Sequence, residues 1–244
     1  MVDKKTTFIL SPRKVIYFLA VITIFLVVAH VIGVLMRFVF GHNSVYGLVP
    51  FFDLDTEKNA PTFFSSLLFL INGLLFFIMW NLRKEDKQYW IWLLLSGICC
   101  FLSLDEFAEI HEQFAKPTRF GLNFIPNLFE DAWVIPWGIA AIIIVILMIP
   151  FFKRINKKIR HWFAWSVLVY ISGAIFIELI GNWYVTTRPF NIICGFLIMI
   201  EEALEMTGLI MLIYTLLTLL QNTCNKLEIN IPFTNSPVKQ IIEN

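Results

Sequence analysis

The stretch that decides the fold is residues 192–220, IICGFLIMIEEALEMTGLIMLIYTLLTLL. A helix rises ~1.5 Å per residue, so this stretch is long enough to cross the ~30 Å hydrocarbon layer of a membrane. It nevertheless carries Glu201, Glu202 and Glu205. A carboxylate in hydrocarbon is costly unless it has a proton, a cation or a hydrogen-bond donor as its partner. The stretch therefore predicts a membrane helix that contributes to a buried polar site.

Five further stretches are apolar and long enough to cross a membrane. The 244-residue chain is 58% hydrophobic and 15% charged, which excludes an ordinary soluble domain. The sequence predicts an all-α polytopic membrane protein, a six-transmembrane-helix bundle in one domain over residues 1–220, with a polar cytoplasmic tail over 221–244. The expected spans are residues 15–38, 62–82, 89–112, 128–152, 162–183 and 192–220.

Basic residues predict the orientation of this bundle. In a six-span arrangement, fourteen of the nineteen Lys and Arg residues fall on the side that holds both termini. Cytoplasmic loops carry the excess of Lys and Arg, so both termini are expected to be cytoplasmic and the protein to lie in a bacterial cytoplasmic membrane. The net charge of +1 indicates no nucleic-acid partner, because the basic residues serve as loop anchors.

Ten of the eighteen acidic residues lie inside or at the edge of these apolar stretches. Depths counted along the expected helices place several of them in one layer, ~24 Å from the cytoplasmic ends. His30 on the first span falls at the same depth. The ten acids are Asp105, Glu106, Glu109, Glu112, Glu130, Asp131, Glu178, Glu201, Glu202 and Glu205.

Helical phase predicts which of these side chains face one another. Asp105, Glu109 and Glu112 follow an i, i+4, i+7 pattern and are expected on one face of the third span, with Glu106 rotated by ~100°. Glu178 and Asn182 are one turn apart on the fifth span. On the sixth, Gly208 continues the face of Glu201 and Glu205, which would let a neighbouring helix approach closely.

The alternative is that these acids are interfacial helix ends or halves of buried ion pairs. For Glu112, Glu130 and His111 that alternative is about as good as a role in a site. The outer side offers five cations, Arg37, Lys58, Lys116, Arg119 and Arg188, which cannot pair ten carboxylates. Some of the carboxyl groups must therefore be protonated or bind a metal ion.

The sequence predicts a divalent metal ion without identifying it. Carboxylate oxygens favour Mg²⁺, Ca²⁺ or Mn²⁺, and added imidazole would allow iron or zinc. A di-iron bundle site needs Glu-x-x-His motifs, but Ala108 stands three positions before His111. His111 and Glu106 are the candidate catalytic residues. The candidate metal ligands are Asp105, Glu109, Glu112, Glu178, Glu201, Glu202, Glu205 and His30.

The segment between the first two spans reads Asp53-Leu-Asp55-Thr-Glu57-Lys58-Asn59. Alternating acids resemble the start of a calcium loop, but Lys58 stands in place of the turn glycine. We therefore expect a solvated polar loop. Pro61 follows at a first-turn position of the second span, where proline is tolerated.

Three motifs carry a resemblance to a known group of proteins. They are Asp53-Leu-Asp55 with Pro61-Thr62-Phe63-Phe64-Ser65-Ser66, Leu104-Asp105-Glu106-x-x-x-Ile110-His111-Glu112, and Glu201-Glu202-x-x-Glu205. Over spans two to six the chain resembles an uncharacterised family of bacterial multi-pass membrane proteins. The resemblance implies a six-helix fold with an acidic site, and it implies no reaction.

These observations support three hypotheses about function. The first is a metal-dependent membrane enzyme, a hydrolase or oxidoreductase, acting on a lipid or other amphipathic substrate from the outer side of the bilayer. The second is a proton- or cation-coupled transporter, in which the same carboxylates carry the ion. The third is a non-catalytic assembly or sensor subunit whose acids form ion pairs with a basic helix of a partner protein. Composition leaves the oligomeric state open.

Overall fold

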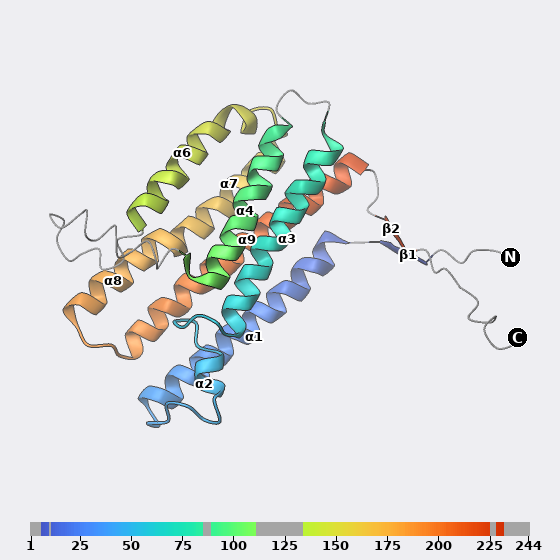
Figure 1. Cartoon of the computed structure of the whole chain (residues 1–244). Helices are drawn as coiled ribbons and strands as arrows, with labels where there is room; N and C mark the ends of the chain where they lie inside the picture. Colours follow the sequence, from blue (N-terminus) through green and yellow to red (C-terminus); the bar gives the residue numbers. More distant parts are fainter. Residues whose placement is uncertain (1–5, 10, 85–88, 111–133, 225–227, 232–244) are drawn as a thin grey trace, which may run out of the picture.

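The structure is a computed structural model that describes residues 6–9, 11–84, 89–110, 134–224 and 228–231. Helices dominate these residues, and one of them contains a π-helical segment, η1 (Figure 1). In chain order the elements are β1 (Thr6–Ile9), α1 (Pro12–Phe38), α2 (Leu48–Phe51), α3 (Ala60–Leu82), α4 (Trp90–Ala108), α6 (Val134–Phe152), α7 (Lys157–Ile171), η1 (Ser172–Ile177), α8 (Glu178–Thr187), α9 (Ile192–Cys224) and β2 (Glu228–Ile231).

Several of these helices are long and apolar enough to cross a membrane, so the protein is a helical, multi-pass membrane protein. Five such spans occur in the described residues: Pro12–Phe38, Ala60–Leu82, Trp90–Ala108, Lys157–Thr187 and Ile192–Cys224. A shorter apolar helix covers Gly138–Phe152. Large apolar side chains such as Phe18, Val21 and Phe25 on α1 are exposed, as expected where lipid is the neighbour.

Helix α9 lies at the centre of the bundle and contacts α1, α3, α7, η1 and α8 (Figure 1). Its residues Met206, Ile213 and Leu216 are fully buried. Helices α3 and α4 pack side by side, and Ser66 Oγ donates a hydrogen bond to the Ser103 carbonyl oxygen at 2.8 Å across their interface. The helix that carries three glutamates is therefore the one surrounded by most of the others.

Helix α6 is attached to the bundle chiefly through its C-terminal end. The Phe151 ring meets the Trp92 ring edge to face at 4.8 Å, and Phe152 packs on Phe163 of α7 at 5.4 Å. Met148 is also buried, while most of the large aliphatic side chains between Ile139 and Ile149 are exposed. The end of α6 thus lies in the same layer as the starts of α4 and α7.

Close helix contacts depend on glycines. A Cβ atom at Gly208 would lie 2.7 Å from the Tyr170 backbone nitrogen and 2.9 Å from the Ser166 carbonyl oxygen, so α7 and α9 approach each other at this point. A Cβ at Gly173 in η1 would lie 2.7 Å from the Glu201 carbonyl oxygen. The close approach expected at Gly208 is therefore confirmed.

The first two spans begin two or three residues earlier than expected, at Pro12 and Ala60, and three other spans differ more. The third ends at Ala108 and not at residue 112, because Glu109 adopts a left-handed conformation with φ 56°. The fifth runs from Lys157 to Thr187 and includes the π-helical segment. The sixth continues beyond residue 220 to Cys224.

A short sheet was not expected. Residues of β1 pair with β2 in antiparallel register, from Thr6↔Ile231 to Ile9↔Glu228. Part of the expected polar tail is therefore strand, and it lies beside the segment that precedes α1 (Figure 1). Both segments are rich in β-branched residues, which favour strands. Each needs the other as its hydrogen-bonding partner, and the two are far apart in the chain.

We predict that Gly208→Ala destabilises the protein, because three atoms of α7 lie within 3.0 Å of the added methyl group and two of them are backbone. Overpacking of this kind costs about 1–3 kcal/mol. Gly97→Ala is the matched control, since nothing lies within 4 Å of a Cβ there. Thermal unfolding in detergent should show a lower Tm for the first variant and an unchanged or higher Tm for the second. Equal Tm values would contradict the proposed packing.

Candidate functional site

A cavity of about 750 Å³ lies between α4, α6, η1, α8 and α9, and the loop before α3 covers part of it. Its apolar lining includes Phe101 and Leu102 of α4, Ala141 and Ile144 of α6, and Ile198 of α9. Protein sites that bind small molecules usually have volumes of ~300–1,000 Å³. The cavity is therefore large enough for an organic ligand as well as an ion.

Eight acidic side chains line this cavity, and among the described residues no Lys, Arg or His does. The three described basic residues near this end of the bundle are engaged elsewhere: Arg37 with Asp53, Lys58 with Glu109, and Arg188 over the Tyr184 ring. The acids of the lining are Asp55, Glu57, Asp105, Glu106, Glu178, Glu201, Glu202 and Glu205.

The π-helical segment brings the fifth span close to the acids of α9. Gly173 in this segment packs directly on the α9 backbone at Glu201. Glu178 is the first residue after the segment, and its Oε1 accepts a hydrogen bond from Asn182 Nδ2 at 3.3 Å. A π-helical turn holds an extra residue and so rotates the helix that follows it. Glu178 and Asn182 consequently both line the cavity.

Two close pairs connect α9 with the fifth span. The carboxyl groups of Glu178 and Glu201 lie close enough to share a hydrogen bond, and so do the Tyr170 hydroxyl and Glu205. Tyr170 also lines the cavity. Two carboxyl groups can form a hydrogen bond only if one of them carries a proton. This part of the cavity can therefore bind a proton between two helices.

The end of α4 contributes Asp105 and Glu106 but not Glu109. Asp105 is 5% exposed, and both residues line the cavity. Glu109 has left the helix, and its Oε1 lies 2.6 Å from Lys58 Nζ. The prediction that Asp105 and Glu109 share one helical face is therefore wrong, because Glu109 is the left-handed C-cap of α4 and its side chain pairs with Lys58. His111 and Glu112, as well as Glu130 and Asp131, lie outside the described residues.

His30 is buried at 3% exposure, but protein atoms engage both of its ring nitrogens. The Leu54 N–H donates to Nδ1 at 3.0 Å, so the ring proton is assigned to Nε2, which lies 3.1 Å from the Gly195 carbonyl oxygen. Neither nitrogen is free to bind a metal ion in this arrangement. His30 instead connects α1 to α9 and to the loop before α3.

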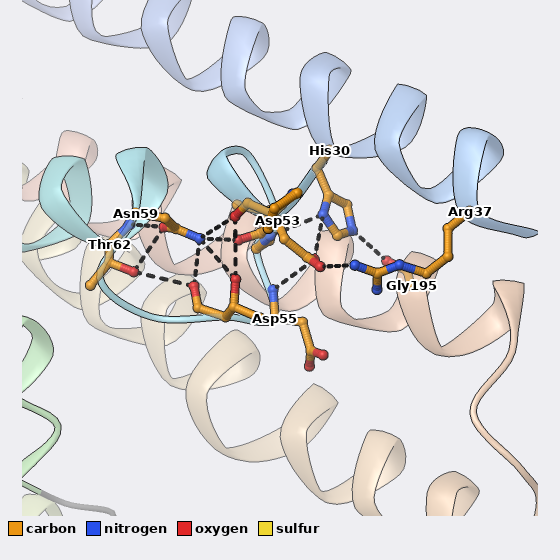
Figure 2. A network of polar contacts seen from close by, with 10 residues as sticks. His30, Arg37, Asp53, Asp55, Asn59, Thr62 and Gly195 are labelled. Carbon is orange, nitrogen blue, oxygen red and sulfur yellow. Dashed lines mark hydrogen bonds and ion pairs between the residues drawn. The ribbon is translucent and has the colours of Figure 1, made fainter. Parts of the chain in front are cut away.

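Residues 53–59, which we call the cap loop, are held by the polar network in Figure 2. Arg37 Nη2 donates to Asp53 Oδ2 at 2.6 Å, and Asp53 Oδ1 lies 3.3 Å from His30 Nδ1. The Asn59 amide donates to the Asp53 carbonyl oxygen at 2.5 Å, and its side-chain oxygen accepts from Thr62 N–H. Asp53 is 4% exposed, so the expectation of a solvated loop is wrong at this residue.

The same network turns Asp55 toward the cavity. Its side chain points away from the other labelled residues in Figure 2 and lines the cavity with Thr56 and Glu57. Burial, and then the negative charge of Asp53, raise the pKa of Asp55 above its ordinary value. Burial alone would raise the pKa of Asp53, but the Arg37 guanidinium and the hydrogen bond from the Asp55 N–H outweigh it and hold the pKa below 3.8.

Sequence reasoning missed four contributors to this region: Asp53 as an anchor, and Asp55, Glu57 and Tyr170 as lining residues. The alternating acids of the cap loop mark this segment in the sequence, but their pattern favours a solvated loop. Tyr170 stands eight positions before Glu178, a rotation of about 80° beyond two turns, which is within one broad face of a regular helix. That spacing was the available signal.

The cavity does not contain a ready-made metal centre in the part of the chain that the structure describes. There, no three His, Cys, Asp or Glu side chains come together closely enough to hold an ion. The acids surround the cavity instead. Since His30 is engaged and His111 is not described, the donors that remain are carboxylate oxygens, with the Tyr170 hydroxyl and the Asn182 amide oxygen beside them.

We predict opposite effects of neutralising Asp53 and Asp55. The lowered pKa of Asp53 means that its stabilising effect is present above pH 3.8 and is lost as the pH falls below that value. Asp53→Asn should lower the free energy of unfolding by about 2 kcal/mol at pH 7, as for other hydrogen bonds to charged groups. Asp55→Asn should leave it unchanged or raise it, because the folded protein favours the protonated form of Asp55.

Denaturation in detergent at pH 7 and at pH 3.5 measures both effects. The stability difference between wild type and Asp53→Asn should shrink at the lower pH. A difference that grows on acidification would contradict the ion pair.

Comparison with known proteins places the chain in a family. A family model described as "Domain of unknown function (DUF8692)" matches residues 16–220, which include the cap loop and all the described acids of the cavity. No curated protein and no solved structure matches the chain. Since the match covers most of the 244 residues, the chain belongs to the DUF8692 family.

Proposed function

We propose that the protein crosses the cell membrane six times with both termini in the cytoplasm. Pairing of β1 with β2 holds the start of α1 beside the end of α9, which supports an even number of crossings. The five long spans alone would give an odd number, so we take α6 as the sixth. The side that holds the termini also carries the excess of basic residues, as in cytoplasmic loops generally.

The acid-lined cavity supports a role in binding a cation together with an amphipathic molecule. Eight acids without a basic residue in the described lining favour a positively charged occupant. Attraction is strong here because helices and lipid keep the local dielectric low. Carboxylate oxygens are the donors that Mg²⁺, Ca²⁺ and Mn²⁺ prefer, which makes iron or zinc the weaker choice.

We propose that the protein is a metal-dependent enzyme acting on a lipid or another amphipathic molecule. The observation that carries this proposal is the two-part lining of the cavity, with acids on α9, η1–α8 and the end of α4, and apolar side chains on α4 and α6. A bare ion needs far less than 750 Å³. The remaining volume suits an acyl chain, and the metal would activate water or a polar group of the substrate. Closure of Glu178, Glu201 and Glu205 around the ion would complete the site.

A second function, proton or cation transfer across the membrane, is favoured by one observation. Glu178 and Glu201 lie close enough to share a proton between two helices. Carboxyl pairs of this kind serve proton relays in membrane transporters. In a transporter the same residues would release their ion on the opposite side, and flux would depend on Glu201.

We predict that Cys224 reacts with a membrane-impermeant maleimide only after the cells are permeabilised, because this exposed residue ends α9 on the cytoplasmic side. His42→Cys, at the other end of the bundle, should react in intact cells. Labelling is read by the mass shift of the purified protein. Reaction of Cys224 in intact cells would contradict the orientation, and reaction of both sites on one side would contradict the even number of crossings.

We predict that the chelator-treated protein binds Mn²⁺ and that Glu201→Gln weakens this binding at least about tenfold, or about 1.4 kcal/mol. The electron paramagnetic resonance signal of free Mn²⁺ measures the affinity in a titration. Glu109→Gln is the control, since Glu109 pairs with Lys58 outside the cavity, and its affinity should stay within about twofold of wild type.

The same samples separate the two functions. Mass spectrometry of bound lipid should find an amphipathic ligand for the enzyme, whereas Mn²⁺ or proton flux into proteoliposomes, lost in Glu201→Gln, would support transport. If the wild-type protein binds none of Mn²⁺, Mg²⁺ and Ca²⁺, the proposed metal site is contradicted.

A further inference from the structure

The cap loop covers the end of the cavity that lies away from the termini. Asp55, Thr56 and Glu57 line the cavity, and the residues on either side of them make the contacts that hold the loop. The loop therefore forms part of the cavity wall on this side. How firmly it is held decides how readily a ligand can enter.

The two attachments of the cap loop differ in strength. At one end, Asp53 is buried, pairs with Arg37 at 2.6 Å and is backed by His30 and Asn59. Near the other end, Lys58 reaches Glu109 at 2.6 Å, but the Lys58 side chain is 70% exposed. Exposed ion pairs contribute little stability and are screened by salt, whereas breaking a buried pair is costly. The contact with Glu109 is thus the one that breaks first.

Backbone strain coincides with this weak contact. In the described residues, positive φ angles outside glycine occur at Val45, Tyr46, Lys58 and Glu109. Both partners of the ion pair are therefore in the left-handed region, Lys58 at φ 62° and Glu109 at φ 56°. Such conformations are costly for residues with a Cβ and tend to occur at ligand clamps and switches. Breaking the contact would allow both residues to leave this region.

We propose that the Lys58–Glu109 ion pair is a releasable latch that controls entry to the cavity from the outer side. When the pair is closed, it joins the cap loop to the end of α4, the helix that supplies Asp105 and Glu106 to the lining. When it opens, the loop stays attached through Asp53 and Asn59 and separates from α4. This inference rests on the proposed role of the cavity as a binding site, and it concerns the rate of entry.

Cys194 provides a test that needs no metal. Its side chain lines the cavity and is 2% exposed, so a thiol reagent must enter the cavity to reach it. The other cysteines, Cys99, Cys100 and Cys224, are changed to Ser in the full-length chain. The rate of modification of Cys194 by a small cationic methanethiosulfonate then measures opening.

We expect Lys58→Met to raise the modification rate of Cys194 at least about fivefold, as for loss of about 1 kcal/mol of ion pairing. The charge exchange Lys58→Glu with Glu109→Lys should bring the rate back to within about twofold of the unexchanged protein. Raising the salt concentration should speed modification when the original pair is present and have little effect in Lys58→Met.

An unchanged rate in Lys58→Met, or a charge exchange that fails to restore slow modification, would overturn the latch. A parallel Mn²⁺ titration keeps this result separate from the proposed function. Faster modification without any Mn²⁺ binding would leave the latch standing and remove the metal site. Equal modification rates in wild type and Lys58→Met, together with normal Mn²⁺ binding, would remove the latch and leave the metal site standing.

Discussion

The cost of placing carboxyl groups in a membrane is the constraint on which the arrangement of this protein depends. Helix α9 carries three glutamates within an otherwise apolar span, and such a helix cannot face lipid on every side. In the bundle it is packed by α1, α3, α7, η1 and α8, so its acids face a cavity inside the protein. The outer helices can then remain apolar toward the lipid.

Glycines and a π-helical turn make this central position possible. Gly173 and Gly208 let the fifth span lie directly on the α9 backbone, at the height of Glu201 and below it. The extra residue per turn in η1 rotates the following helix, and Glu178 then lies near Glu201. The helices come together through small residues, as is common in membranes, and the polar groups fill the space left between them.

The cap loop makes the cavity depend on residues far from it in the chain. Arg37 and His30 of α1 and Gly195 of α9 hold Asp53 and Leu54, and that attachment orients Asp55. The charge arrangement is asymmetric: Arg37 pairs with the buried Asp53, so it supports the loop and does not neutralise the cavity. No Lys or Arg of the described lining neutralises its acids, which supports a proton, a metal ion or a cationic group as the occupant.

Sequence alone determined the membrane class, the positions of the apolar helices to within a few residues, and the close approach at Gly208, because hydropathy and helical periodicity are local properties. It also singled out Glu178, Glu201 and Glu205 as acids inside apolar stretches. Only the tertiary structure decided that Glu109 leaves the helix to meet Lys58, that His30 supports a loop, and that Asp55 lines the cavity. Those outcomes depend on contacts between segments that are far apart in the chain, and local sequence patterns do not predict such contacts.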